Sequence, residues 1–182
     1  MFELDRILFL AFNATPETPH AVVQLAVFVS NVLPWLALGI LLVLFARGAA
    51  PMRRAVLLCL ASMALTWCAA QAIRWALPMP RPAQLGLGTQ WVAHGLRPGF
   101  PSMHMSSASA LAMALTLGGA RRWALAAWAC ALLMGWSRLC LGVHFPSDVL
   151  AGLFTGSGCA LLAALGARLL ARHRTVSAHG RS

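Results

Sequence analysis

The chain has 182 residues, of which 60% are hydrophobic and 10% are charged, and its mean hydropathy is +0.75. This composition excludes an ordinary soluble globule and indicates a single integral membrane domain. The net charge of +10 comes from arginines that lie between apolar runs and form no basic stripe interleaved with aromatic residues, so we expect no nucleic-acid partner.

The first element in chain order is an apolar segment from Phe2 to Phe12, whose charges cluster near one end. It is too short to cross a bilayer, and we expect it to form an interfacial helix. Residues 13–19 contain two prolines and several cap-forming polar residues, which predict a turn. The N-terminus lacks the basic region and cleavage site of a removable signal peptide, so we expect the first apolar run to be retained.

Five apolar runs of roughly bilayer length follow, since a helix needs about 20 apolar residues to span a membrane. They are Ala21–Ala46, Ala55–Leu77, Ser102–Gly119, Trp123–Leu141 and Ser147–Leu170. The sequence therefore predicts an all-α fold, a polytopic membrane helical bundle of about five transmembrane helices plus the N-terminal interfacial helix. We assign residues 1–172 to a single membrane domain and residues 173–182 to a polar cytoplasmic tail.

Arginines gather at alternate ends of these runs, and the positive-inside rule makes that side cytoplasmic. This set comprises Arg47, Arg53, Arg54, Arg121, Arg122, Arg168, Arg172, Arg174 and Arg181. The N-terminal segment and the second and fourth connections then face the exterior. In or beside these two connections lie Arg74, Arg81, His94, Arg97, His104, Arg138, His144 and Asp148.

Metal sites are poorly supported by the residues available. The chain has four acidic residues, and Asp148 is the only one after Glu17, so a metal site built from carboxylates is excluded. The five cysteines show no C-x-x-C spacing and mostly lie inside apolar runs, where they are expected to be small packing residues. We expect neither a metal ion nor a cofactor.

The first motif ends the second apolar run and reads Arg74-Trp-Ala-Leu-Pro-Met-Pro-Arg81-Pro82. Two guanidinium groups near the outer surface suit a phosphate, because each can donate two parallel hydrogen bonds to its oxygens. The alternative is that Arg74 and Arg81 are interfacial anchors, as arginines at the ends of spans often are.

The second motif, from Gly99 to His104, lies where the third apolar run begins. Ser102 is placed to be a helix N-cap, and the free backbone N–H groups of a helix N-terminus attract phosphate. His104 would face the same phosphate and could protonate a departing oxygen. The alternative for His104 is a core or interfacial histidine.

The third motif runs from Ser137-Arg138 to His144 and Asp148, with Pro146 placed early in the fifth helix. A helix that begins near Phe145 or Pro146 puts His144 and Asp148 about one turn apart. The carboxylate can then accept a hydrogen bond from one ring nitrogen and leave the other basic. The alternative is that Asp148 only favours the helix dipole.

Together, Arg-x6-Arg-Pro, Pro-Ser-x-His and Ser-Arg-x5-His-x3-Asp resemble the type-2 phosphatidic acid phosphatase superfamily, over the stretch from Arg74 to Asp148. The resemblance implies a helical bundle in which His144 attacks phosphorus to form a phosphohistidine and Asp148 orients it. It implies that His104 protonates the leaving group and later activates water. By the same match the phosphate oxygens are bound by Arg74, Arg81, Ser102 and Arg138 in place of a metal.

Two positions depart from the family pattern, which usually has lysine at Arg74 and glycine at Met103. Arginine keeps the charge and changes its geometry. Met103 can still donate its backbone N–H to phosphate if it is helical, but its side chain crowds the site or contacts a lipid chain. These departures bear on substrate preference more than on activity.

The short length, the segment before the first run and the compact run around His144 look like bacterial undecaprenyl-diphosphate phosphatases of the bacitracin-resistance type. That likeness implies hydrolysis of undecaprenyl diphosphate to undecaprenyl phosphate at the outer face of the bacterial inner membrane, recycling the carrier lipid for cell-wall biogenesis. The expected partners are a lipid phosphate and the bilayer.

Other readings of the sequence stay open. The substrate could be phosphatidylglycerol phosphate, phosphatidic acid or a lipid A phosphate, and the phosphoryl group could pass to a hydroxyl instead of water. A non-enzymatic transporter or scaffold is a third class. For Arg97 and His94 the alternatives are contact with a second phosphate or a head group, and simple anchoring of their connection.

Overall fold

The computed structural model describes residues 3–95 and 97–179, with backbone alone for residues 174–179. Every element in these ranges is helical: α1 (Glu3–Phe12), α2 (His20–Asn31), α3 (Leu33–Arg47), α4 (Ala50–Ala76), the 3-10 helix η1 (Pro82–Leu85), α5 (Met103–Leu117), α6 (Arg121–Cys140) and α7 (Pro146–His179). The predicted all-α membrane bundle is confirmed.

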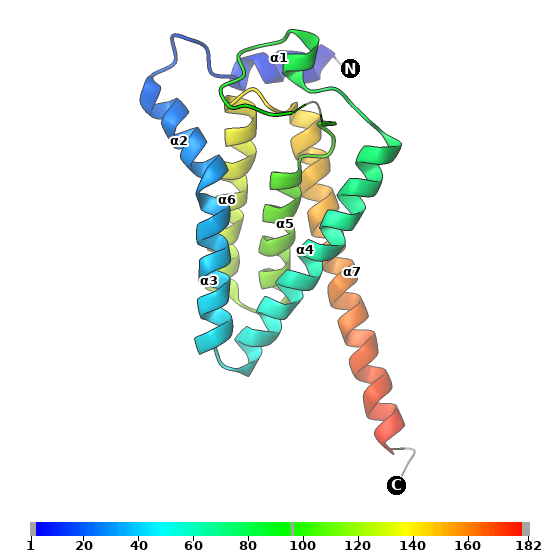
Figure 1. Cartoon of the computed structure of the whole chain (residues 1–182). Helices are drawn as coiled ribbons and strands as arrows, with labels where there is room; N and C mark the ends of the chain where they lie inside the picture. Colours follow the sequence, from blue (N-terminus) through cyan, green and yellow to red (C-terminus); the bar gives the residue numbers. More distant parts are fainter. Residues whose placement is uncertain (1–2, 96, 180–182) are drawn as a thin grey trace.

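The central helix of the bundle is α5, which packs against α4, α6 and α7 (Figure 1). Its closest neighbour, α7, approaches it through two glycines one turn apart, Gly152 and Gly156. A Cβ atom on Gly152 would lie 2.7 Å from the carbonyl oxygen of Ser102. The absence of side chains at these two glycines therefore lets α7 lie directly on the start of α5.

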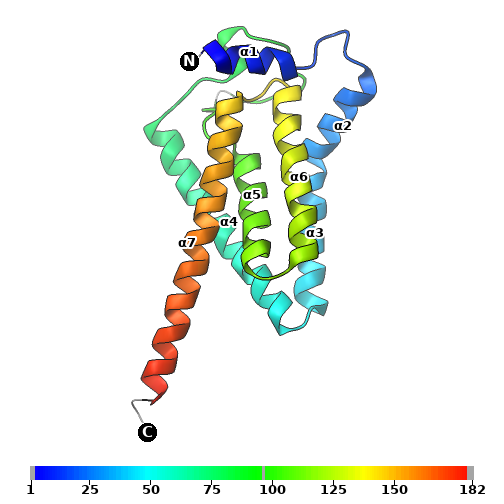
Figure 2. The ribbon, with the colours of Figure 1, turned by 180° about the vertical axis from the view of Figure 1, so that it is seen from behind.

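The N-terminal helix α1 lies across one end of the bundle, as Figure 1 and the reverse view in Figure 2 both show. It buries Asp5 and Phe9 and exposes Leu4 and Ile7. This placement agrees with the interfacial helix expected for this segment, of which Phe2 lies outside the described residues.

The predicted number of spans is not confirmed. By length and composition, α4, α6 and α7 can each cross a membrane, whereas α2 and α3 qualify only as a pair bent by 42°. The break falls at Val32, just before Pro34, whose ring cannot continue the hydrogen bonding of the preceding helix. The predicted first span is therefore two helices.

The predicted third span, α5, has 15 residues. At about 1.5 Å per residue it extends roughly 22 Å, less than the roughly 30 Å of a bilayer core. It begins below the upper ends of α6 and α7 (Figure 1), because residues 77–95 and 97–101 fold across that end of the bundle. The functional motif at its start thus lies below the end of the bundle.

The two ends of the bundle differ in charge. The α3–α4 and α5–α6 connections and the C-terminal part of α7 lie at the end opposite to α1 (Figure 1). They carry the arginine clusters from which the orientation was predicted. The predicted tail, 173–182, continues α7 as far as His179, and residues 180–182, with Arg181, lie outside the described residues.

Candidate active site

A polar cavity of about 450 Å³ lies under residues 77–101. Its walls come from all three motifs and from the connection between α4 and α5: Arg74, Arg81, Ala93, His94, Gly95, Arg97, Met103, His104 and His144. The structure thus brings five of the eight predicted site residues to one cavity wall, and Ser102, Arg138 and Asp148 lie behind it.

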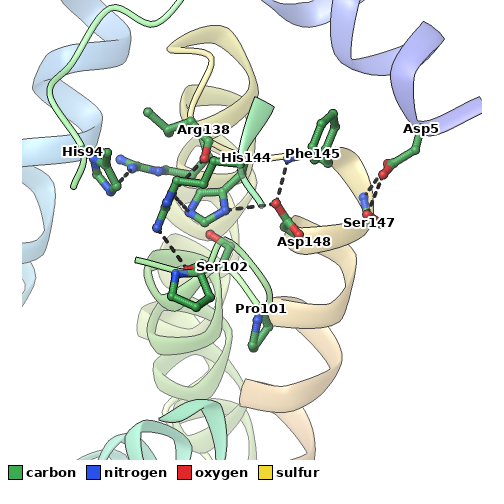
Figure 3. Close-up of polar contacts among 12 residues, drawn as sticks. Asp5, His94, Pro101, Ser102, Arg138, His144, Phe145, Ser147 and Asp148 are labelled. Carbon is green, nitrogen blue, oxygen red and sulfur yellow. Dashed lines mark hydrogen bonds and ion pairs between the residues drawn. The ribbon is translucent and has the colours of Figure 1, made fainter. Parts of the chain in front are cut away.

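His144 is held on both ring nitrogens. It is 1% exposed, its Nδ1 lies 3.3 Å from Asp148 Oδ2, and its Nε2 lies 3.2 Å from Nη1 of Arg81 (Figure 3). A guanidinium group can only donate hydrogen bonds, so Nε2 must accept and Nδ1 must carry the proton that it donates to the carboxylate. This tautomer places the lone pair on Nε2, beside the cavity, where it accepts the hydrogen bond from Arg81.

Burial holds the pKa of His144 well below its ordinary value of 6.5, and the charges of Arg81 and Arg138 act in the same direction. The ring is therefore neutral at neutral pH. A neutral imidazole is the form that can act as a nucleophile.

Asp148 connects the second and third motifs. It lies in the first turn of α7, and the same oxygen, Oδ2, that faces His144 also accepts a hydrogen bond from the backbone N–H of Phe145 at 2.9 Å. Its backbone carbonyl accepts from the N–H of Ser102 at 3.0 Å. The pairing with His144 predicted from their spacing is present, and α7 begins at Pro146 as expected.

The guanidinium of Arg81 is fixed by backbone oxygens. It is 5% exposed and donates from Nη1 to the carbonyl of Val143 at 2.8 Å and from Nε to that of Arg97 at 3.0 Å. Burial, with the charge of Arg74, lowers the pKa of Arg81 to about 10, so it stays cationic at neutral pH. A fixed cation beside His144 is placed to hold a phosphate oxygen.

Arg74 reaches the cavity from the last turn of α4, where its Nη2 donates to the carbonyl of Pro101 at 3.0 Å. Among the described atoms, its buried Nε has no hydrogen-bond partner. Arg74 and Arg81 therefore face one cavity, as their spacing predicts.

Ser102 occupies the N-cap position of α5, as predicted, but its side chain does not cap the helix. Its Oγ is fully buried and, within the described part of the chain, has no partner. Met103 and His104 follow in the first turn, half-buried, and both line the cavity. A buried hydroxyl without a partner is costly unless a ligand or water satisfies it.

Arg138 does not reach the cavity wall in this structure. It is fully buried, donates from Nη1 to the hydroxyl of Ser30 on α2, and lies 3.2 Å through Nη2 from Nε2 of His94 (Figure 3). His94 does line the cavity, and burial, with Arg81 and Arg138, lowers its pKa to about 4, so it is a neutral acceptor. Arg138 thus acts on the cavity through His94.

The role of α1 was not visible in the sequence. Asp5 accepts hydrogen bonds from the backbone N–H of Ser147 at 2.9 Å and from its Oγ at 2.7 Å, at the start of α7 (Figure 3). Phe9 packs edge to face on Phe145, with ring centroids 5.4 Å apart. Both contacts hold the residues that immediately follow His144.

Asn13, after α1, joins the α4–α5 connection to the end of α6. Its Nδ2 donates to the carbonyls of Thr89 at 2.9 Å and Cys140 at 3.1 Å, and its Oδ1 accepts from the N–H of Thr89 at 2.7 Å. The local sequence around Asn13 predicted only a turn and did not indicate these contacts. Its partners are 76 and 127 positions away, which no local pattern reveals.

Within the described ranges, no three histidine, cysteine or acidic side chains gather as a metal site requires. The cavity offers arginine and histidine side chains, which suit an anion.

Comparisons with known proteins agree with this chemistry. The sequence profile of the PAP2 superfamily matches residues 55–170. A provisionally assigned undecaprenyl-diphosphatase of Escherichia coli K12, YbjG, is 30% identical over 158 residues, which cover 86% of this chain and 79% of the relative. A lipid A 1-phosphatase of Rhizobium etli is 38% identical over 77 residues, 42% of this chain and 33% of that protein.

Two solved structures share the fold. The crystal structure of Aquifex aeolicus LpxE superposes with a TM-score of 0.71 at 25% identity, covering 89% of this chain and 95% of that one. A transmembrane PAP2-type phosphatidylglycerolphosphate phosphatase from Bacillus subtilis gives a TM-score of 0.64 at 21% identity, covering 88% and 82%.

Proposed function

The chain belongs to the PAP2 superfamily of membrane phosphatases, and from that premise we propose that it hydrolyses undecaprenyl diphosphate to undecaprenyl phosphate. The similarity to YbjG over most of both chains supports this choice of lipid. The observation that carries the catalytic proposal is the environment of His144, whose Nε2 lone pair faces a cavity lined with arginines.

The charge around the cavity suits a diphosphate. Four guanidinium groups, those of Arg74, Arg81, Arg97 and Arg138, stand in or behind the walls against the single carboxylate of Asp148. The excess of three positive charges matches the roughly three negative charges of a diphosphate monoester, since one phosphate carries up to about two. A monophosphate would neutralise less of it.

In the first step, the Nε2 lone pair of His144 attacks the terminal phosphorus. The bond between that phosphorus and the bridging oxygen breaks, and its electron pair stays on the oxygen of the leaving undecaprenyl phosphate. His104 gives this oxygen a proton, and the negative charge of the bound phosphate favours the protonated form of His104. The hydrogen bond that Arg81 donates to Nε2 moves to a phosphate oxygen, which frees the lone pair.

In the second step, water attacks the phosphohistidine and gives its proton to His104. The bond between nitrogen and phosphorus breaks, its electrons return to Nε2, and inorganic phosphate leaves. Asp148 stabilises the positive ring during both steps, because its Oδ2 accepts from Nδ1. The backbone N–H of Met103, the hydroxyl of Ser102 and the guanidinium groups of Arg74 and Arg81 hold the phosphate oxygens.

We place the protein in the bacterial inner membrane with the cavity facing the exterior. The support is the charge of the two ends, since the arginine clusters lie opposite to the cavity. A diphosphate released outside the cell would meet the site from that side.

The partial similarity to a lipid A 1-phosphatase favours a second candidate, a lipid A phosphate. That match covers 42% of this chain and only a third of the relative. It therefore supports the phosphate chemistry more than the choice of lipid.

The test is phosphate release in detergent with excess chelator, from undecaprenyl diphosphate, phosphatidic acid, phosphatidylglycerol phosphate and lipid A 1-phosphate. His144→Ala should abolish release. His20→Ala, a change of an exposed histidine at the start of α2, is the matched control and should leave release intact. Phosphate release that survives His144→Ala, or that needs a metal ion, would overturn the mechanism. A preference for another lipid would overturn the assignment of undecaprenyl diphosphate as the substrate.

A further inference from the structure

A second cavity, of about 330 Å³, lies inside the bundle next to the polar one. Its walls come from α3, α4, α5 and α6 and are almost entirely apolar, with Leu38, Met63, Ala108 and Met134 among them. We call this cavity the apolar groove.

The apolar groove and the polar cavity share two wall residues, Met103 and His104. His104 is the proposed donor of a proton to the leaving oxygen, so that oxygen must lie beside the junction. The hydrocarbon chain of undecaprenyl phosphate begins beyond the inner phosphate, a few bonds from that oxygen, and Met103 stands where the chain would turn into the groove.

The groove begins beside the bend between α2 and α3. The helices break at Val32, and the next residues, Leu33 and Pro34, line the groove. Further along α3, Leu41 is 5% exposed and belongs to the core cluster that includes Ala112 of α5 and Ala127 of α6. Leu41 also lines the groove, so the groove extends along α3 from Leu33 to the point where α3 packs against the core.

We propose that the apolar groove binds the first part of one hydrocarbon chain of the lipid substrate, and that Met103 at its junction with the polar cavity excludes lipids with two chains; this rests on the proposed function. The volume supports one chain. If each methylene-sized group takes about the 30 Å³ of a water molecule, 330 Å³ holds roughly eleven such groups. A polyprenyl chain enters singly, whereas a diacylglycerol phosphate divides into two chains within a few bonds of phosphorus.

Selection here depends on shape more than on hydrophobicity. A lipid tail that leaves the bilayer for a groove of leucine and methionine exchanges one apolar surrounding for another, so burial contributes little net affinity. The groove then acts by positioning the chain and by admitting one chain past Met103. The family's usual glycine at this position would leave the junction wider.

The first test compares two lipids with the same glycerol phosphate, oleoyl lysophosphatidic acid with one chain and dioleoyl phosphatidic acid with two. In nanodiscs, kcat/KM should favour the single chain by roughly tenfold, the discrimination that shape alone commonly supplies. Ala37→Phe, which fills the groove from α3, should lower the rate on the single chain. Met103→Gly should raise the rate on two chains, so both changes bring the ratio toward one.

The matched control is Ala129→Phe, at an exposed position of α6 outside the groove, which should keep the ratio of the wild type. Because a ratio of rates does not depend on the amount of folded protein, poor folding of one variant does not imitate the expected result. Equal kcat/KM values for the two lipids in the wild type, or a ratio that neither Ala37→Phe nor Met103→Gly moves, would overturn the proposal.

The second test locates the chain without turnover. In the His144→Ala variant, a single-chain alkyl phosphate with a diazirine near its fifth carbon should cross-link to α3 and α5 at the groove, and Ala37→Phe should remove that product. Cross-links only to the outer faces of α2 or α7 would overturn the proposal. If single-chain lipids are preferred but undecaprenyl diphosphate is not hydrolysed, the proposed substrate is wrong and the proposed role of the groove is kept. If undecaprenyl diphosphate is hydrolysed without selection between one and two chains, the proposed substrate is kept and the proposed role of the groove is wrong.

Discussion

Replacing Asp148 by asparagine removes one negative charge beside His144 and keeps an oxygen that can hold the ring. Both hydrogen bonds of the carboxylate, from Nδ1 of His144 and from the N–H of Phe145, go to the single atom Oδ2. An amide oxygen in that position can accept both. Asp148→Asn therefore tests the charge separately from the geometry.

The magnitude follows from the distance of 3.3 Å between Nδ1 and Oδ2. When His144 becomes positive on attack, a unit charge at this separation and an effective dielectric constant of about 20 is worth about 5 kcal/mol. The hydrogen bond that the amide oxygen still accepts offsets about 1 kcal/mol of this loss. The remaining loss of about 4 kcal/mol predicts a fall in kcat of roughly 10³-fold. Asp148→Ala, which also removes the acceptor, should fall further.

The assay is the initial rate of phosphate release from undecaprenyl diphosphate, with an alkaline quench to trap phosphohistidine. The control is Asp5→Asn, the same change at another buried carboxylate that accepts two hydrogen bonds at the start of α7. Asp5 contacts Ser147 and not His144, so its loss should cost less than about tenfold. A fall below tenfold for Asp148→Asn, or equal falls for both variants, would refute the reasoning.

Three further outcomes are expected. NMR titration of histidine-labelled protein should find His144 neutral at pH 6, because its pKa lies well below 6.5 and the ring gains its proton only as the pH falls further; a midpoint at 6.5 or above would contradict this. Gly156→Ala should lower the free energy of unfolding by about 1–3 kcal/mol, because its Cβ would clash with the backbone of α5. Gly158→Ala places its Cβ in open space and should leave the free energy of unfolding unchanged. Equal effects of the two changes would argue against close packing of α5 and α7. Phe9→Ala should lower the free energy of unfolding by about 3 kcal/mol and should also lower kcat. Phe12→Ala, at a half-exposed position, should have a smaller effect on both quantities. An unchanged kcat for Phe9→Ala would show that α1 does not support the site.

The contacts that could be predicted from the sequence are those between neighbours in the chain. His144 and Asp148 are four positions apart at a helix start, and the helix geometry alone brings their side chains together. The apolar runs likewise predict helices, because a backbone in a bilayer must satisfy its own hydrogen bonds. The same reasoning overestimated continuity: the first run contains a break at Val32, and the run at α5 is shorter than a span.

Contacts between distant parts of the chain were decided only by the tertiary structure. Asp5 and Ser147 are 142 positions apart, and Ser30 and Arg138 are 108 apart, so nothing in either local sequence identifies the partner. The apolar groove likewise brings together residues of α3, α4, α5 and α6 that are far apart in the sequence. Sequence alone predicted which runs are helical, since that follows from composition, and its motifs led to the prediction of which residues carry the chemistry. The packing of the helices determined which side chains brace the site and where a lipid chain can lie, because those depend on surfaces that meet only in the folded bundle.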